Sequence, residues 1–113
     1  LSQVIIKTLG PTQGTLLLAS TDLSHFYSYS KAKTLDRTFI DLVDKMEPQA
    51  LSRALSQGKT EACGGGPTVT VLLAAREMRA KRACILGYAN SGDVTGDHSR
   101  VVGYFSAAIT IQD

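Results

Sequence analysis

Thr15-Leu-Leu-Leu-Ala19 is an unbroken apolar run, and Ser20-Thr-Asp-Leu-Ser-His-Phe26 follows it at once. An apolar run without alternation predicts a strand covered on both faces, because a half-exposed strand alternates between apolar and polar residues. In α/β folds, ligands bind where the strands end at their carboxyl side. We therefore take Asp22 and His25 as the first candidate site residues, although ordinary loop polarity explains them as well.

The composition is that of a single globular domain. The chain has 113 residues, of which 43% are hydrophobic and 19% charged, and this balance is not that of a disordered or fibrous protein. The formal net charge is +2 and Trp is absent, so we expect no nucleic-acid partner. No apolar run approaches the ~18 residues of a membrane-spanning helix, so we expect no membrane partner.

The first residues and the cysteines give two further expectations. Leu1, Val4 and Ile5 lie at helical spacing, and the chain does not begin with Met, so we expect a fragment of a longer protein that starts in or near an amphipathic helix. Cys63 and Cys84 form no disulfide framework, which favours a reducing, cytoplasmic location. Cys84 lies in an apolar run and is interpreted as a small core residue.

The rest of the chain alternates between helical and strand patterns. Helices are predicted over 35–46, 48–57 and 67–81, and strands over 83–89 and 101–111, where residues alternate with period two. Loops are predicted over 20–33 and 90–100, and Asp36 is expected to face water from its helix. These elements predict an α/β fold, a mixed sheet with helices packed on it, in which the last two strands form an antiparallel pair.

A second unusual stretch is Ala62-Cys-Gly-Gly-Gly-Pro67, which predicts a tight turn that leads into a helix. Cys63 lies just before the helix amino terminus, where the helix dipole favours a thiolate. If this turn and the first strand end on the same side of the sheet, Asp22, His25 and Cys63 converge. The alternative is that Cys63 suits the turn by its size and His25 caps a loop.

A converged group of this kind has two chemical interpretations. A thiolate and an imidazole together bind zinc, copper or iron. The same two side chains, with Asp22 to orient the imidazole, would equally form a Cys-His nucleophile pair. The residues alone leave both interpretations open.

Four stretches resemble, in order, the signatures of the Memo family, whose bacterial and archaeal members are called AmmeMemoRadiSam system protein B. They are Ser20-Thr-Asp-Leu-Ser-His25, Glu61-Ala-Cys-Gly-Gly-Gly-Pro67, Tyr88-Ala-Asn-Ser-Gly-Asp-Val-Thr-Gly-Asp97 and Val101-Val-Gly-Tyr104. The resemblance extends over essentially the whole chain but only over the carboxyl-terminal part of the family. It implies one Memo-like α/β domain over residues 1–113, with a sandwich fold like that of class III extradiol dioxygenases.

The resemblance also implies a site. Cys63 matches the family's metal-binding cysteine, and His25 and Asp22 match the histidine and aspartate that line the same pocket. The implied metal is iron or copper and the implied chemistry is redox, while the family's other two ligand histidines belong to the missing amino-terminal half. We therefore predict Cys63 and His25 as metal ligands, and Asp22, His25 and Cys63 as a catalytic group acting on an unknown substrate.

Two other functions stay open beside a metal-dependent oxidoreductase. One is a non-enzymatic domain that binds a peptide or small molecule in a dioxygenase-like pocket, and the other is a Cys-His hydrolase. Half of a sandwich leaves apolar strand faces open. We therefore expect the chain to associate with the missing amino-terminal half or with another copy of itself.

Overall fold

The structure, a computed structural model, describes residues 1–9 and 14–111. Gly10-Pro-Thr-Gln-Gly14 predicts a turn, because glycine and proline break regular structure, and this stretch lies outside the described residues apart from Gly14. Helices and strands confirm the predicted α/β class. In chain order they are α1 (Ser2–Leu9), β1 (His25–Tyr27), α2 (Tyr29–Asp44), α3 (Pro48–Ser56), α4 (Gly65–Glu77), β2 (Arg82–Asn90), α5 (Gly92–Thr95) and β3 (Val101–Thr110).

The strands form a sheet in the order β1-β3-β2. β2 and β3 pair antiparallel along their lengths, from Arg82 opposite Thr110 to Asn90 opposite Gly103, which confirms the predicted pair. β1 is short and also pairs antiparallel with β3. The prediction of a mixed sheet was therefore wrong for the described strands, because both neighbouring pairs are antiparallel. For β2 and β3 the reason is the connection through α5, which is too short for the crossover that a parallel pair needs.

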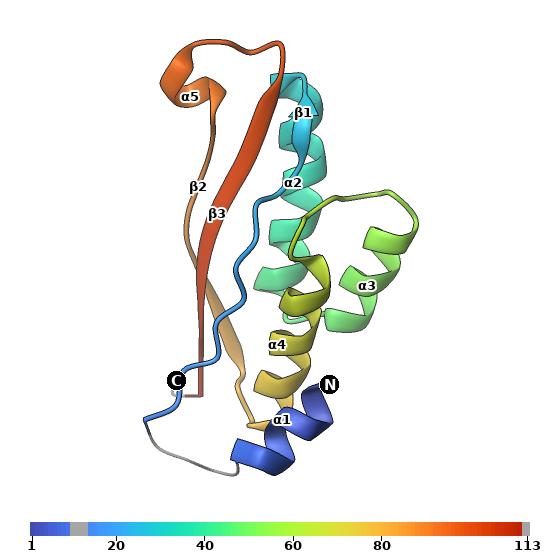
Figure 1. Ribbon diagram of the computed structural model, residues 1–113, viewed down its shortest axis with the longest axis vertical. Coiled ribbons are helices and arrows are strands. Elements are labelled where there is room, and N and C mark those ends of the chain that lie inside the picture. Colours follow the sequence, from blue (N-terminus) through green and yellow to red (C-terminus); the bar gives the residue numbers. More distant parts are fainter. Residues whose placement is uncertain (10–13, 112–113) are drawn as a thin grey trace.

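The helices α2, α3 and α4 lie on one face of the β2–β3 ribbon, and α3 packs outside α2 and α4 (Figure 1). α2 begins after Ser28, whose hydroxyl accepts a hydrogen bond from the Lys31 N–H. Leu35, Phe39 and Val43 then recur every four residues on its buried face. The ring of Phe39 meets Phe105 of β3 edge to face, at 5.5 Å between centroids, so this pair joins the helix layer to the sheet.

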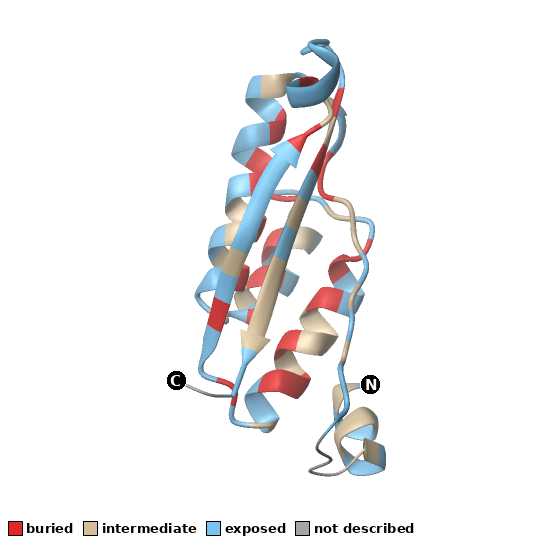
Figure 2. Cartoon of the chain, turned by 90° about the vertical axis from the view of Figure 1, so that its left-hand side faces the viewer, coloured by how far each residue is buried: buried red, intermediate tan, exposed pale blue. Residues whose placement is uncertain are grey.

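The other face of the ribbon is much more exposed. Figure 2 views the strands from the side away from the helices, where β2 is exposed over most of its length and β3 is mainly of intermediate burial. Ala83 is buried toward the helices, whereas Cys84 is exposed and Leu86 keeps 65% of its surface accessible. The prediction that Cys84 is a core residue was wrong, because successive strand residues point to opposite faces and only one face is covered.

The apolar run at residues 15–19 is not a strand in the structure. It runs beside β3 (Figure 1), and Leu16 and Leu18 are 84% and 82% exposed. Further along the chain the backbone bonds to β3 at Leu23, whose N–H donates to the Gly103 carbonyl at 2.8 Å. The strand prediction was wrong because an apolar run becomes a strand only where its backbone joins the regular hydrogen-bond ladder of a sheet, and apolar character alone does not determine this.

Several boundaries differ from the predictions for local reasons. The predicted loop over 20–33 contains β1 and the first turn of α2, and the loop over 90–100 contains α5. α4 begins at Gly65, before Pro67, because the first turn of a helix does not need the missing proline N–H. Asp36 does not face water but is fully buried, because the neighbouring Gly103 leaves room for its carboxylate.

None of the helices within 1–9 and 14–111 is long and apolar enough to cross a membrane.

The turn before α4 packs directly on the segment that precedes β1. A Cβ at Gly64 would overlap the Ser20 carbonyl oxygen and lie 2.6 Å from the Thr21 Cβ, whereas a Cβ at Gly66 would meet nothing within 4 Å. We therefore expect Gly64→Ala to lower the free energy of unfolding by about 1–3 kcal/mol. Gly66→Ala should leave it unchanged or raise it by up to ~1 kcal/mol. Urea denaturation of both variants checks this, and an equal loss in the two would contradict it.

Candidate metal centre

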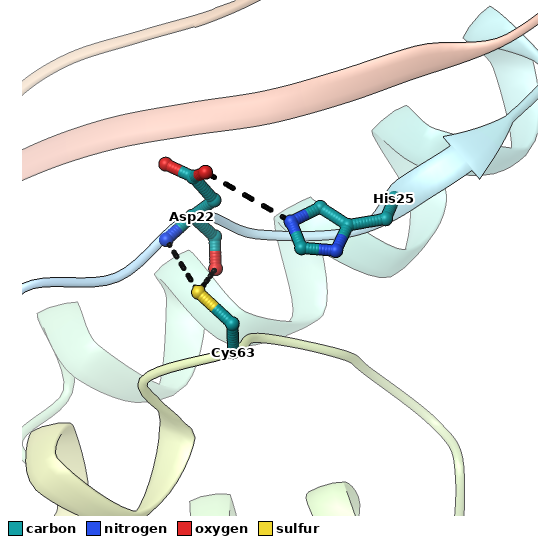
Figure 3. A group of neighbouring side chains, drawn as sticks. All are labelled: Asp22, His25 and Cys63. Carbon is teal, nitrogen blue, oxygen red and sulfur yellow. Dashed lines mark hydrogen bonds and ion pairs between the residues drawn. The ribbon is translucent and has the colours of Figure 1, made fainter.

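Asp22, His25 and Cys63 lie together, although about 40 residues of the chain separate Cys63 from the other two (Figure 3). Asp22 lies just before β1, His25 is the first residue of β1, and Cys63 lies in the turn before α4. One ligand atom from each residue lies within 4.8 Å of the others. The structure thus brings together the three side chains predicted from the sequence.

The thiol is held against the backbone of Asp22. The Asp22 N–H donates to the Cys63 Sγ at 3.2 Å, and the Cys63 N–H donates to the Asp22 carbonyl at 3.2 Å. Next to this pair, the N–H of Gly64, which follows Cys63, donates to the Oγ1 of Thr21, which precedes Asp22, at 2.8 Å. These bonds fix the turn to the segment before β1, so the position of Cys63 depends on backbone contacts as well as on its own rotamer.

The two other side chains are more loosely held. The Nε2 of His25 lies 3.9 Å from the Asp22 Oδ2, and the side chains are 41% and 49% exposed. An ion pair this open to water contributes little to stability. The imidazole and carboxylate are therefore free to adjust toward a ligand, while their backbone stays in place.

The pairing of β1 with β3 is irregular directly after His25. His25 pairs with Val102 and Tyr27 pairs with Val101, with an irregularity between them. Phe26 lies at this irregularity with φ of 67°, a left-handed conformation that costs a bulky residue energy. Bulges bend a strand and redirect its side chains, and here the bulge follows immediately after the imidazole.

Phe26 and Arg100 border the candidate site. The Phe26 ring is 61% exposed, its centroid lies 5.8 Å from that of His25, and the Arg100 guanidinium lies over it at 5.0 Å. The pattern of the sequence gave no indication of this pair, because Arg100 belongs to a distant loop. Thr21, in contrast, lies within the motif that pointed to Asp22 and His25.

The donor set fits a metal ion. Zinc lies about 2.0–2.3 Å from its sulfur, nitrogen and oxygen ligands in a tetrahedral arrangement, so two ligands of one ion are roughly 3.3–3.8 Å apart. The three ligand atoms here lie within 4.8 Å of one another, so the exposed side chains of Asp22 and His25 would have to move closer to Cys63 to bind one ion. Cys63 and His25 supply the soft and intermediate donors that suit copper, iron or zinc, and Asp22 supplies a carboxylate.

The second histidine belongs to a different cluster. His98 is exposed and stacks on Tyr29 at 4.3 Å between centroids. The Tyr29 hydroxyl donates to the Asp93 Oδ1 at 2.6 Å, and this bond, followed by one from the Asn90 N–H, lowers the pKa of Asp93. The same bond raises the pKa of Tyr29. His25 is thus the one histidine of the described chain in the candidate metal centre.

Comparison with known proteins places the chain in a family. The family model described as Memo-like protein matches residues 1–108. The chain is 35% identical over 92 residues to a MEMO1 family protein of Methanopyrus kandleri, a match that covers 81% of this chain and 32% of that protein. It is 40% identical over 91 residues to a MEMO1 family protein of Sulfolobus acidocaldarius, covering 80% and 32% respectively.

A third relative shows the same proportions. The MEMO1 family protein of Methanosarcina acetivorans is 37% identical over 97 residues, covering 86% of this chain and 36% of that protein. The chain thus spans about a third of the length of the curated relatives it matches. Because the family model matches almost every residue, the chain belongs to the Memo family.

Proposed function

We propose that this chain forms one wall of a non-haem metal site for redox chemistry, with Cys63 and His25 as ligands. The convergence of a thiol, an imidazole and a carboxylate from two distant segments carries the proposal. All three side chains reach solvent, so a metal and a substrate have access to them. Buried structural cysteines and histidines would lack this access.

The metal that we propose is iron or copper. A thiolate together with an imidazole suits copper, iron and zinc, and of these metals zinc has no redox chemistry of its own. A bound iron or copper ion would supply electron transfer to a substrate that the site leaves unidentified. We also propose that the fold of the whole site is similar to that of class III extradiol dioxygenases.

Within such a site the residues of this chain have distinct tasks. Cys63 binds through Sγ, which the Asp22 N–H already approaches at 3.2 Å. His25 binds through one ring nitrogen, and Asp22, 3.9 Å away, orients the imidazole or exchanges a proton with the substrate. Two ligands leave coordination positions open, and we propose that these are filled by residues of the family's remaining length and by substrate.

A non-enzymatic binding domain is the second candidate, and one observation favours it. A groove of about 730 Å³ separates residues 15–21 from β3, with α4 along its base. Leu17, Val71, Phe105 and Ile109 are among the apolar side chains that line it, as is usual for sites that bind peptides or small molecules. Ligand binding that survives complete chelation of metal would favour this candidate over the redox site.

The two cysteines provide a matched test of the metal site, because both are free and exposed. In the natural full-length chain, Cys63→Ala should weaken iron or copper binding at least about tenfold, since it removes a ligand atom. Cys84→Ala should leave the affinity unchanged, because Cys84 lies on the uncovered face of β2. Elemental analysis after dialysis against a competing chelator measures both. Stoichiometric metal in Cys63→Ala would end the assignment of Cys63 as a ligand.

We also propose that the apolar surface around Leu16 and Leu18 is covered by the rest of a full-length family member or by a second copy. Both side chains are more than four-fifths exposed, which is unusual for neighbouring leucines on a monomer. In sedimentation velocity, the 113-residue chain should therefore self-associate in the micromolar range. The double substitution Leu16→Ser and Leu18→Ser should shift it toward monomer. A compact monomer for the unsubstituted chain would contradict the proposal.

A further inference from the structure

We infer that Asp36, on α2, is a positioning residue that holds the backbone between Asp22 and His25 in place. Asp36 is fully buried, and neither the motifs nor the ligand set includes it. A buried carboxylate is costly unless its oxygens accept hydrogen bonds. The groups that donate hydrogen bonds to Asp36 therefore indicate its role.

The two carboxylate oxygens of Asp36 accept hydrogen bonds from different elements. Oδ1 accepts the backbone N–H of Ser24 at 3.0 Å, and Oδ2 accepts the hydroxyl of Tyr88 at 2.7 Å. Burial, followed by this bond to Asp36, raises the pKa of Tyr88.

Ser24 is the residue that receives this support. Its own N–H bonds to Asp36, and its carbonyl accepts the Gly103 N–H at 3.0 Å. The residue is fully buried. Both backbone polar groups of Ser24 are thus fixed, one by α2 and one by β3, in the short stretch that joins Asp22 to His25.

The packing of Asp36 is specific to this arrangement. A Cβ at Gly103 would overlap the Asp36 carboxylate, so the carboxylate occupies the space that a side chain in β3 would fill. α2 and β3 are thereby brought close enough for both to contact Ser24. A residue of the same shape without acceptor oxygens would keep this packing but lose the bond.

Local backbone support matters because the candidate ligands hold each other only weakly. The side chains of Asp22 and His25 are nearly half exposed and 3.9 Å apart. Without the bond to Asp36, the Ser24 N–H would be buried and unpaired, and the segment would open toward water to satisfy it. The donors of Asp22 and His25 would then separate from Cys63. This consequence for metal binding rests on the proposed function.

Hydrogen exchange measured by NMR tests the inference without any metal. Asp36→Leu keeps the shape of the side chain and removes both acceptors, whereas Asp36→Asn keeps one oxygen for the Ser24 N–H. Tyr88→Phe is the matched control, because it removes the bond to Oδ2 and leaves the bond to Ser24. The amides of Asp22 and Ser24 report the site, and the Leu51 amide of α3, bonded to Glu47 at 2.9 Å, serves as the reference outside the site.

In Asp36→Leu, the Asp22 and Ser24 amides should exchange about tenfold faster relative to Leu51. In Asp36→Asn and Tyr88→Phe, the same ratio should stay within about threefold of the unsubstituted chain. Equal acceleration at all three amides in Asp36→Leu would show a merely structural role and overturn the inference. Failure of Asp36→Asn to restore the ratio would overturn it too. If Asp36→Leu does not fold, Asp36→Ala takes its place in the same comparison.

Cobalt binding to the natural full-length chain provides the second readout. Thiolate-to-cobalt absorption should show about tenfold weaker binding of Co²⁺ in Asp36→Leu and an affinity near that of the unsubstituted chain in Asp36→Asn. Unchanged affinity in Asp36→Leu would contradict a positioning role. If the unsubstituted chain itself binds no cobalt, the proposed metal function fails, while the exchange ratios still decide whether Asp36 positions the segment.

Discussion

The absence of a side chain at Gly103 is the constraint on which the arrangement around the candidate site depends. The backbone of this residue bonds to Leu23 and Ser24, and the space beside it holds the Asp36 carboxylate. β3 can therefore lie close to α2 and to the stretch before β1 at the same point. The turn that contains Cys63 is hydrogen-bonded to Asp22 in that stretch. The position of the thiol therefore depends indirectly on the contacts of Gly103.

Periodicity predicted the parts of the fold whose pattern is local. The i, i+4 spacing of Leu35, Phe39 and Val43 and the alternation along β3 are decided by which face is buried, and the structure agrees with both. The apolar run at 15–19 misled for the opposite reason. A strand is defined by hydrogen bonds to a neighbour, and residues 15–19 lie beside β3 without becoming part of the sheet.

In the candidate site, too, local sequence patterns predicted some residues, and other residues depend on neighbours that are distant in the sequence. The motifs that contain Asp22, His25 and Cys63 could be found in the sequence, because each is an unusual local combination of polar residues, glycine and proline. Asp36 was missed because an acidic residue in a helix predicts an exposed face, although Asp36 lies four residues after Ala32 and three before Phe39 on the buried face of α2. Arg100 was missed for another reason, since its contact with Phe26 depends on a loop that folds back to the start of β1.

The conformation of Phe26 has a consequence for how such a protein changes over generations. A left-handed φ at a bulky residue costs on the order of 1–3 kcal/mol, and glycine at that position would recover part of it. Stabilising replacements are usually easy for random mutation to reach. A lineage selected for thermal robustness alone would therefore drift away from phenylalanine at position 26. A lineage in which function depends on the aromatic ring beside His25 would keep phenylalanine despite the lower stability. The residue found at position 26 therefore distinguishes selection for stability from selection for function.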